Sequence, residues 1–496
     1  MISIAFRNVE VLDGLGGDPV LVDVGVSEGR ITNVGFVPMA ETEVDGQGCI
    51  LSPGFIDTHA HDDGAFIRHP GMEFKLQQGV TSVVNGNCGF SAIPSDSSID
   101  KFSSSGGILA GLTGDFNDLE GYFSTVLKKR PAINNMMLVG HNTVRSLVMG
   151  DEKRAPSGRE LLRMKDHVKL ALDQGCCGFS SGLIYRPGRY SLTEEVVELA
   201  GIAGGAGALY TTHMRNEGDK LLEAVDEALF IGRESGAHLH ISHHKAAGRA
   251  NWGKVSESLA KIEAALVSGQ RVSLDVYPYT AGSGRMIEYF NVDDPNEELA
   301  KAIRIASCPA NRDYEGRMLE EIALEKKLSM KEMVRSVLLS PDGDKTICIQ
   351  FVISEGDVET NLRHHDVMIG SDGIPDLNGR PHPRLFGTFP RVLGHYVREK
   401  NLLSLSEAVR RMTSLAAKTF GLLERGQIKE GYFADLVLFD PKEIIDRATY
   451  DEPKLPPKGI KMVLVNGAVA LKDGQLTGAG AGRMLRYQRE SFSSQK

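Results

Sequence analysis

Two histidines stand two residues apart in the segment PGFIDTHAHDD, at positions 59 and 61. The apolar residues before His59 predict a short β-strand. Alternate residues of a strand point to the same face, so His59 and His61 can reach one metal ion. Two solvated loop histidines would look the same in isolation, so the interpretation depends on where other metal-binding side chains lie.

Further metal-binding side chains follow other short apolar runs. Parallel strands of a barrel place their C-terminal ends, and with them the active site, at one end of the fold. Side chains that follow such runs should therefore meet, and a chance gathering of so many metal-binding types is improbable. They are Cys88 in NGNCG, His213 in TTHMRNE, His243 and His244 in ISHHK, and Asp372 in IGSDG.

Some of these residues have alternative interpretations. A lone cysteine is more often a small buried hydrophobic residue, but the polar, turn-like sequence around Cys88 favours a functional thiolate. His243 and His244 cannot both point inward on one strand; we favour His243 and leave His244 to packing or to a contact that supports a metal-binding side chain. Asp372 could simply form a Ser-Asp-Gly turn, yet at the end of the last strand we expect a metal-bridging carboxylate and general base.

A barrel is needed to bring these side chains together, and the sequence predicts one. Between residues 53 and 420, short runs rich in Val, Ile and Leu alternate with helical patterns such as LLEAVDEALFIGRESG. This alternation is typical of parallel strands with crossover helices. We therefore predict an α/β fold, a (β/α)8 TIM barrel, with strands at 54–58, 80–85, 135–140, 178–181, 208–212, 238–242, 271–277 and 367–371.

Two further parts are expected around the barrel. The interval between the seventh and eighth strands is too long for an unstructured loop, so we predict an inserted subdomain at about 285–346. Both ends of the chain show strand alternation broken by Gly or Asp turns, as in ISIAFRNVEVLDG and IKMVLVNGAVALKDG. We infer one small β-sandwich domain assembled from residues 1–52 and 421–485, followed by a tail at 486–496.

Composition excludes several classes of protein. Among the 496 residues, 41% are hydrophobic and 24% charged with a net charge of -9, so nothing favours a nucleic-acid or membrane-surface partner. The N-terminus alternates like a strand rather than a signal peptide, and no apolar run is long enough to cross a membrane. The six cysteines are irregularly spaced, unlike a secreted disulfide framework, so we expect a cytoplasmic location.

The motifs of the predicted barrel resemble, in order, those of the N-acyl-D-amino-acid deacylases (D-aminoacylases) of the amidohydrolase superfamily. They are PGFIDTHAHDD, QGVTSVVNGNCGFS, SSGLIYRPG, TTHMRNE, ISHHK, DVYPYTAGS, GSDG and HPRLFGTFPRVLGHYVRE. Common binuclear members of that superfamily carry a carboxylated lysine on strand four, where this chain has GFSSGLIY. The resemblance implies that Cys88 replaces this ligand. It implies a tight Zn2+ held by Cys88, His213 and His243, and a weaker or empty second position lined by His59, His61 and Asp372.

The resemblance also assigns catalytic and substrate-binding roles. Asp372 would move a proton from water to the leaving amine, and His59 would help to steady the tetrahedral oxyanion. A free α-carboxylate entering a partly dry site needs cations and hydroxyls. Arg384 is one candidate cation, but Arg380 and Arg391 lie close to it in the sequence, so which arginine binds the carboxylate stays open. The candidates are Tyr185, Lys245, Tyr277, Ser283 and Arg384; His141, after the third strand, is expected to face the same mouth without an assigned role.

The expected activity is therefore hydrolysis of N-acyl-D-amino acids to a carboxylate and a free D-amino acid, with a small-molecule N-acyl amino acid as the binding partner. The D preference rests on the resemblance alone. A cyclic amidase, or a dipeptidase for unusual linkages, is the alternative within the superfamily, and Cys88 with the missing strand-four lysine counts against it. A non-catalytic barrel is the other alternative, but such relatives lose the paired histidines and the final aspartate. The sequence does not indicate an oligomeric state.

Overall fold

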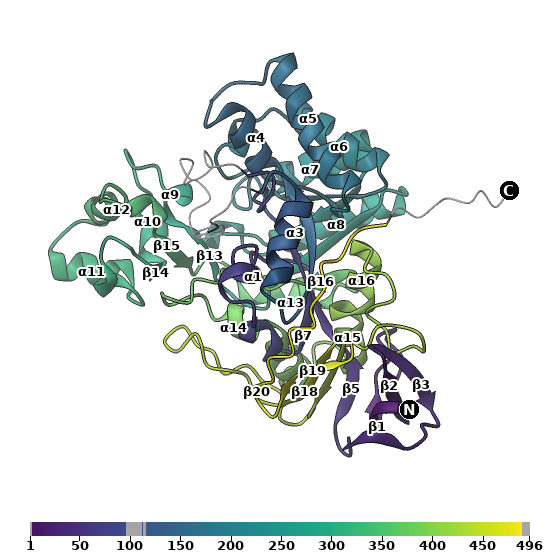
Figure 1. Cartoon of the computed structure of the whole chain (residues 1–496). Helices are drawn as coiled ribbons and strands as arrows, with labels where there is room; N and C mark the ends of the chain where they lie inside the picture. Colours follow the sequence, from purple (N-terminus) through teal and green to yellow (C-terminus); the bar gives the residue numbers. More distant parts are fainter. Residues whose placement is uncertain (1, 96–111, 113–115, 489–496) are drawn as a thin grey trace.

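The computed structural model describes residues 2–95, 112 and 116–488. A barrel of parallel strands and helices forms the centre of the molecule, with a β domain and an inserted subdomain on different sides of it (Figure 1). Of the predicted tail at 486–496, residues 489–496 lie outside the described part. Within that part, no helix combines the length and the apolar character needed to cross a membrane.

Eight parallel strands form the barrel, in the sheet order β6-β7-β8-β9-β10-β11-β12-β16. All eight predicted strands are confirmed, with ends shifted by at most two residues. An isolated bridge between Ala60 and Gly373 joins the two outermost strands, so the barrel is nearly closed. The strands are β6 (Phe55–Asp57), β7 (Val80–Asn85), β8 (Asn134–Gly140), β9 (Gly178–Gly182), β10 (Leu209–His213), β11 (His238–Ile241), β12 (Val272–Val276) and β16 (Val367–Ile369).

Helices follow the strands and cover the outside of the barrel (Figure 1). The longer ones end near glycines or begin at capping residues, such as Ser157, which forms a capping box with Glu160. They are α3 (Leu119–Lys128), α4 (His141–Met149), α5 (Gly158–Asp173), α6 (Thr193–Gly205), α7 (Leu221–Ser235), α8 (Lys254–Val267), α13 (Glu355–Arg363), α14 (Arg384–Arg391), α15 (Leu405–Met412) and α16 (Ser414–Phe420), with the short α1 (Ala65–Arg68) and α2 (Glu73–Leu76).

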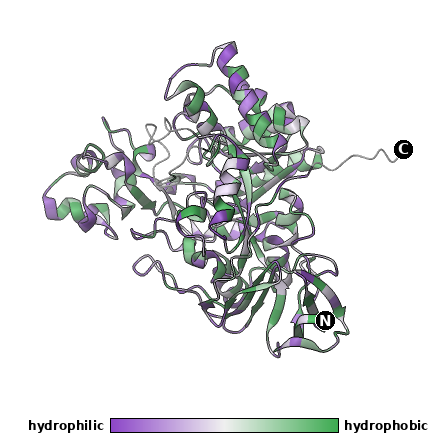
Figure 2. Ribbon diagram, in the orientation of Figure 1, coloured by the Kyte–Doolittle hydropathy of each residue, from purple (hydrophilic) through white to green (hydrophobic). Residues whose placement is uncertain are grey.

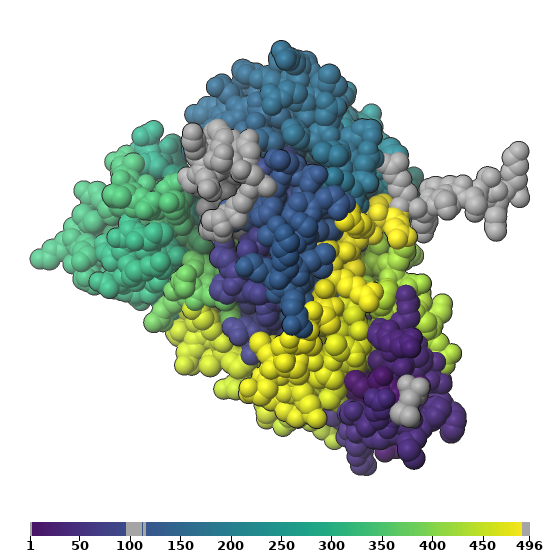
Figure 3. Space-filling model, viewed as in Figure 1, coloured from purple at the N-terminus to yellow at the C-terminus, as the bar shows by residue number. Residues whose placement is uncertain are grey.

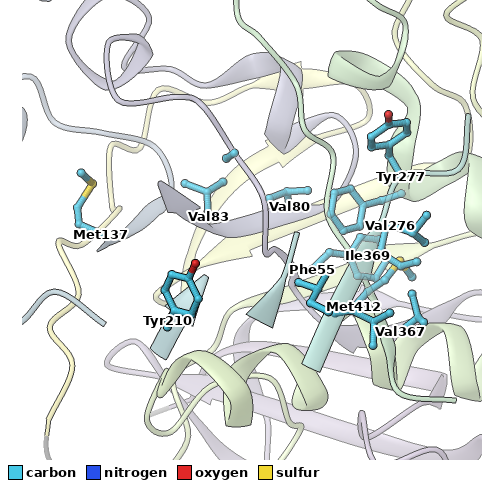
Figure 4. Packing of buried hydrophobic residues seen from close by; sticks show 14 of the residues in the cluster. Phe55, Val80, Val83, Met137, Tyr210, Val276, Tyr277, Val367, Ile369 and Met412 are labelled. Atoms are coloured by element: carbon cyan, nitrogen blue, oxygen red, sulfur yellow. The ribbon is translucent and has the colours of Figure 1, made fainter. Parts of the chain in front are cut away.

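Barrel strands are apolar on both faces because both faces are buried. Phe55, Val83 and Met137 belong to the large core that includes the surrounding helices (Figure 4). Their neighbours in the sequence, such as Ile56 and Val84, belong to a second cluster that includes residues of α16. The strands of both large sheets are mainly hydrophobic, whereas the helices mix hydrophobic and hydrophilic residues (Figure 2). This double burial explains why strands such as β7 and β12 contain few charged residues, although buried hydroxyl and amide side chains also occur in β8, β9 and β10.

The β domain combines strands from both ends of the chain in one nine-stranded sheet. The antiparallel pairing of β5 with β17 joins the N-terminal and C-terminal strands. Side chains from both groups share one core, which includes Phe6, Val24, Leu436 and Leu464. The two segments adjoin on the molecular surface as purple and yellow regions (Figure 3). The strands are β1 (Ile2–Val11), β2 (Val20–Ser27), β3 (Arg30–Gly35), β4 (Ala40–Asp45), β5 (Ile50–Pro53), β17 (Leu436–Phe439), β18 (Ile460–Val465), β19 (Ala468–Lys472) and β20 (Gln475–Leu476).

The segment between β12 and β16 forms a small subdomain with its own hydrophobic core. A three-stranded antiparallel sheet, in the order β13-β15-β14, carries four short helices. Its first strand, β13, follows β12 closely, so one edge of the subdomain lies beside the C-terminal ends of the barrel strands. The elements are β13 (Gly282–Arg285), α9 (Met286–Tyr289), α10 (Glu297–Lys301), β14 (Ile303–Ser307), α11 (Leu319–Lys326), α12 (Met330–Leu338) and β15 (Ile347–Gln350).

Candidate metal centre

Cys88 lies at the centre of three imidazoles contributed by other strand ends. Its Sγ is 3.3 Å from Nε2 of His59, 3.4 Å from Nε2 of His243 and 3.8 Å from Nδ1 of His213. Zinc bound tetrahedrally at about 2.3 Å from sulfur and about 2.1 Å from nitrogen separates these two ligands by about 3.6 Å. All four side chains are buried. The spacing and chemistry of this group therefore fit a zinc ion.

His59, His61 and Asp372 form a second group of potential ligands beside the first. Oδ1 of Asp372 is 3.1 Å from Nε2 of His61 and 3.7 Å from Nε2 of His59. Because His59 belongs to both groups, any two ions held here would be neighbours. The six side chains that the sequence predicted as ligands thus meet at one end of the barrel.

Backbone turns at the strand ends direct three of these side chains inward. Cys88, His243 and Asp372 have φ angles of 55°, 37° and 50°, in the left-handed region that residues other than glycine rarely adopt. Such conformations cost free energy and are concentrated at functional sites. Each of these residues follows a barrel strand, so the backbone strain is located between the strand ends and the site.

Electrostatics in the centre favour the anionic forms of Cys88 and Asp372. Burial alone would raise the pKa of the Cys88 thiol, but neighbouring His59 and His243 hold it well below its usual range. Burial opposes protonation of His61, but Asp372 and Cys88 raise its pKa to about 9. Arg384 and the imidazoles outweigh burial at Asp372 and keep its pKa well below the usual range. The thiolate and the carboxylate are therefore the stable forms, as metal coordination requires.

Asp275 of β12, which the sequence analysis did not single out, connects several parts of the centre. It accepts hydrogen bonds from Thr58 Oγ1 at 2.9 Å and from the backbone N–H of His243 at 2.5 Å. Its Oδ2 also lies 3.0 Å from Nε2 of His240 and 3.7 Å from Nδ1 of His59. A carboxylate within the apolar run VSLDV is the sequence signal that could have identified it.

Glu217, also missed, supports the other two histidines. Its Oε1 accepts a hydrogen bond from Lys245 Nζ at 2.7 Å and lies 3.1 Å from Nδ1 of His243, while its Oε2 lies 3.4 Å from Nε2 of His213. A carboxylate on the far nitrogen of a metal-binding imidazole fixes the tautomer and ring orientation. Its position four residues after His213 in TTHMRNE is the only signal in the sequence.

The predicted substrate-binding residues surround the same centre. Lys245 Nζ lies 5.6 Å, and the Arg384 guanidinium 4.5 Å, from the centroid of the Tyr277 ring. The Tyr185 ring packs against His213 with centroids 4.7 Å apart. A pocket beside the ligands is lined by His61, Phe90, Tyr185, Ser283, Gly284, Arg285, Glu288, Asp372 and Ile374. The inserted subdomain supplies part of this wall, because Ser283, Gly284 and Arg285 belong to β13.

The contacts show where the side chains lie in two choices that the sequence left open. His243 faces Cys88, whereas the His244 ring nitrogens lie 2.7 Å from Asn361 Oδ1 and from Ser258 Oγ, between helices. Arg384 lies in the centre. In contrast, Arg380 donates to the Asp451 carbonyl and Arg391 pairs with Asp446.

The expectation that His141 faces the mouth of the barrel is wrong. His141 is the first residue of α4, directly after β8, and its Nε2 lies 2.8 Å from Oε1 of Glu195 on α6. The early start of the helix turns its side chain into the helical layer. Arg145 completes this buried cluster, which lies outside the metal centre.

Comparison with known proteins agrees with this geometry. A model described as the amidohydrolase family matches residues 201–471. An N-acyl-D-glutamate deacylase of Alcaligenes xylosoxydans xylosoxydans is 42% identical over 92% of this chain and 91% of its own length. Two solved structures superpose with TM-scores of 0.90 and cover 98% of this chain. One is an N-acyl-D-glutamate deacylase from Bordetella bronchiseptica, complexed with zinc and a phosphonate inhibitor that mimics the tetrahedral intermediate. It is 38% identical to this chain, and the match covers 99% of its own length. The other is a D-aminoacylase with a binuclear metal centre, in which one metal activates and the second attenuates. It is 40% identical to this chain, and the match covers 100% of its own length.

The match extends over the barrel, the inserted subdomain and both parts of the β domain, because nearly the whole of each chain is covered. The amidohydrolase model itself covers more than half of the sequence. This protein belongs to the amidohydrolase family and, within it, to the N-acyl-D-amino-acid deacylases.

Proposed function

We propose that this protein hydrolyses the amide bond of N-acyl-D-amino acids with zinc as its metal, releasing a carboxylate and a free D-amino acid. The observation that carries the proposal is the juxtaposition of Cys88 and its three histidines with the Arg384 and Lys245 cations. Such a site offers a metal centre with cations for a substrate carboxylate next to it. The names of the relatives favour D-amino acids as substrates.

Cys88, His213 and His243 would hold the tight zinc ion. These residues come from three different strand ends, and Glu217 orients both imidazoles. His59, His61 and Asp372 would line the second, weaker position. When bound, zinc supplies Lewis acidity that activates water and polarises the amide carbonyl.

Asp372 would act as the general base and then as the general acid. Its ionised carboxylate can accept the proton of the attacking water and return it to the leaving amine nitrogen. His59 would help to steady the oxyanion as part of the metal centre, where its Nε2 lies 3.3 Å from Cys88 Sγ and 3.7 Å from Asp372 Oδ1. Both side chains are fixed by neighbours, since Asp372 pairs with Arg384 and His59 lies beside Asp275.

The α-carboxylate of the substrate would be held by Arg384, Lys245 and the hydroxyls of Tyr185, Tyr277 and Ser283. Two buried cations near the Tyr277 ring favour an anionic group at this position. The Tyr277 hydroxyl has no hydrogen-bond partner among the described residues and is available to such a ligand. Binding of the carboxylate at this point would set the orientation of the scissile amide over the metal centre.

The proposed partner is a small N-acyl amino acid rather than a nucleic acid or a membrane. We also propose a cytoplasmic location, because all six cysteines are free thiols and four of them are buried outside the metal centre.

The deciding experiment incubates the zinc-loaded protein with paired N-acetyl-D- and N-acetyl-L-amino acids that have acidic, apolar or basic side chains. Release of free amine is measured. Selective release from D-substrates is expected and would also identify the preferred side chain. Release from a cyclic amide or a dipeptide, with none from the N-acetyl-D-amino acids, would replace the proposed reaction with another one of the same family.

A further inference from the structure

The two strands that carry the second group of ligands meet at the one seam of the barrel. In the described part of the chain, hydrogen-bonded ladders join every neighbouring pair of barrel strands from β6 round to β16, and β6 and β16 meet through the Ala60–Gly373 bridge. His59 and His61 follow β6, and Asp372 follows β16. The distance between these ligands therefore depends on contacts across the seam rather than on a strand ladder.

A buried ammonium group lies across this seam. Lys75 of α2 is completely buried, and its Nζ donates hydrogen bonds to Asp57 Oδ2 at 2.6 Å and to Ser371 Oγ at 3.0 Å. It also lies 3.2 Å from Oδ2 of Asp62. Asp57 and Asp62 flank the two histidines of β6, and Ser371 directly precedes Asp372, so one cation contacts both sides of the seam.

Asp57 extends the contact to the backbone of the ligands. Its Oδ1 accepts hydrogen bonds from the N–H of Ser371 at 2.7 Å and of His59 at 3.2 Å. The backbone N–H of Asp372 in turn donates to the His59 carbonyl at 2.8 Å. These bonds tie the main chain of His59 to that of Asp372 through a carboxylate that Lys75 neutralises.

We propose that Lys75 is a positioning residue for the metal centre, because its ammonium group fixes His59 and His61 relative to Asp372 across the seam of the barrel. This inference rests on the proposed function. Lys75 touches neither metal nor substrate; it acts through Asp57, Asp62 and Ser371. Without its ammonium group, the hydrogen bond from Lys75 to Ser371 across the seam is lost, and two fully buried carboxylates on the β6 side, Asp57 and Asp62, are left without their counter-charge. Asp57, which accepts the N–H groups of both His59 and Ser371, is then no longer held in place, so the second metal position and the proton-transferring carboxylate are displaced together.

The test compares Lys75→Met with Arg145→Met in the holoenzyme. Arg145 is equally buried and pairs with Glu195 at 3.0 Å, but its contacts lie outside the centre. Unfolding temperature, zinc per chain, the affinity for a second zinc equivalent, kcat and KM are measured for both. Loss of supporting contacts around a metal site typically costs about 10- to 100-fold in metal affinity or activity. For Lys75→Met we expect a loss of this size in kcat and in second-zinc affinity, with KM and the first zinc retained, whereas Arg145→Met loses thermal stability alone.

Equal kcat values for the two variants at the same folded fraction would overturn the inference, as would a rise in KM with unchanged kcat. If Lys75→Met does not fold, Ser371→Ala is the deciding variant, because it removes the hydroxyl that accepts from Lys75 and donates to Asp57 across the seam while both buried charges keep each other as partners. A kcat and a second-zinc affinity that stay at the wild-type values in Ser371→Ala would overturn the inference as well. A wild-type protein that releases no amine from any N-acyl-D-amino acid would instead refute the proposed function, and the second-zinc affinity would still report on Lys75.

Discussion

Arg384 is ion-paired with Asp372, with Nη1 of the guanidinium 2.9 Å from Oδ2 of the carboxylate. The residue proposed to bind the substrate carboxylate thus contacts the residue proposed as general base. The Nε of Arg384 has no hydrogen-bond partner among the described residues. Nη1 is engaged by the base and Nη2 donates to the Ser283 carbonyl at 3.3 Å, so Nε is the donor left for a carboxylate, which would place the scissile amide next to Asp372.

Arg384→Lys should weaken substrate binding more than turnover. A guanidinium binds a carboxylate through a planar fork, whereas an ammonium is a point charge on a flexible stem. We expect KM for the preferred N-acetyl-D-amino acid to rise by about tenfold or more, the equivalent of about 1.4 kcal/mol. The corresponding N-acetyl-D-amino-acid amide, which lacks the α-carboxylate, should show little change in kcat/KM. Arg391→Lys, outside the centre, is the matched control. Equal losses on both substrates would show that Arg384 does not bind the carboxylate.

Asp372→Asn should abolish proton transfer while the tight zinc position remains filled. The amide is nearly isosteric with the carboxylate but cannot accept the proton of water. General acid–base catalysis contributes about 10²- to 10⁴-fold to rate, so kcat should fall by that factor. Zinc content by elemental analysis should stay near one ion per chain, since Cys88, His213 and His243 are unchanged. Retention of wild-type kcat would remove Asp372 from the role of base; Asp376→Asn, in a nearby turn, is the control.

Cys88→Ala should reduce zinc content and activity together. Removal of the thiolate leaves His59, His213 and His243 without the anion at their centre, and a zinc site loses one of its ligands. Stoichiometry after dialysis and kcat at saturating zinc are the measurements. Cys176→Ala is the matched control, because that thiol is equally buried but packs in the hydrophobic core. If Cys88→Ala retained its full zinc content, Cys88 would be a packing residue.

The gathering of the proposed metal ligands at one end of the barrel was predictable because these residues follow short strands, and parallel strands end at the same side of a barrel. Residues that act through contacts were not predictable in this way. Asp275, Glu217 and Lys75 are ordinary charged residues in the sequence, and only the folded chain shows which imidazole, backbone amide or carboxylate each one contacts.

Side-chain direction at loops and helix starts was also beyond the sequence. The sequence does not show which of Arg380, Arg384 and Arg391 lies beside Asp372, whereas the structure shows that Arg384 does. His141 was assigned to the mouth because it follows a strand, but α4 begins at that residue and turns the ring toward Glu195. A strand end therefore predicts a position in the barrel better than it predicts the direction of a side chain.

The cluster of His141, Arg145 and Glu195 should contribute to stability with a definite pH dependence. Burial alone would raise the pKa of Glu195, but the hydrogen bond from His141 and the charge of Arg145 hold it below its ordinary value of 4.5. A carboxylate with a lowered folded-state pKa stabilises the fold above its unfolded pKa, and this contribution is lost as the pH falls through the folded value.

Glu195→Gln should therefore lower the free energy of unfolding at neutral pH by about 3 kcal/mol, because Arg145 is left buried without its counter-charge. The difference from the wild type should shrink as the pH falls through the folded-state pKa of Glu195, where the wild-type carboxyl is itself protonated. Denaturant unfolding over a series of pH values measures both effects, and Glu194→Gln, at the exposed neighbouring position, is the control. A destabilisation that stays constant from neutral to acid pH would mean that the carboxylate charge is not what stabilises this cluster.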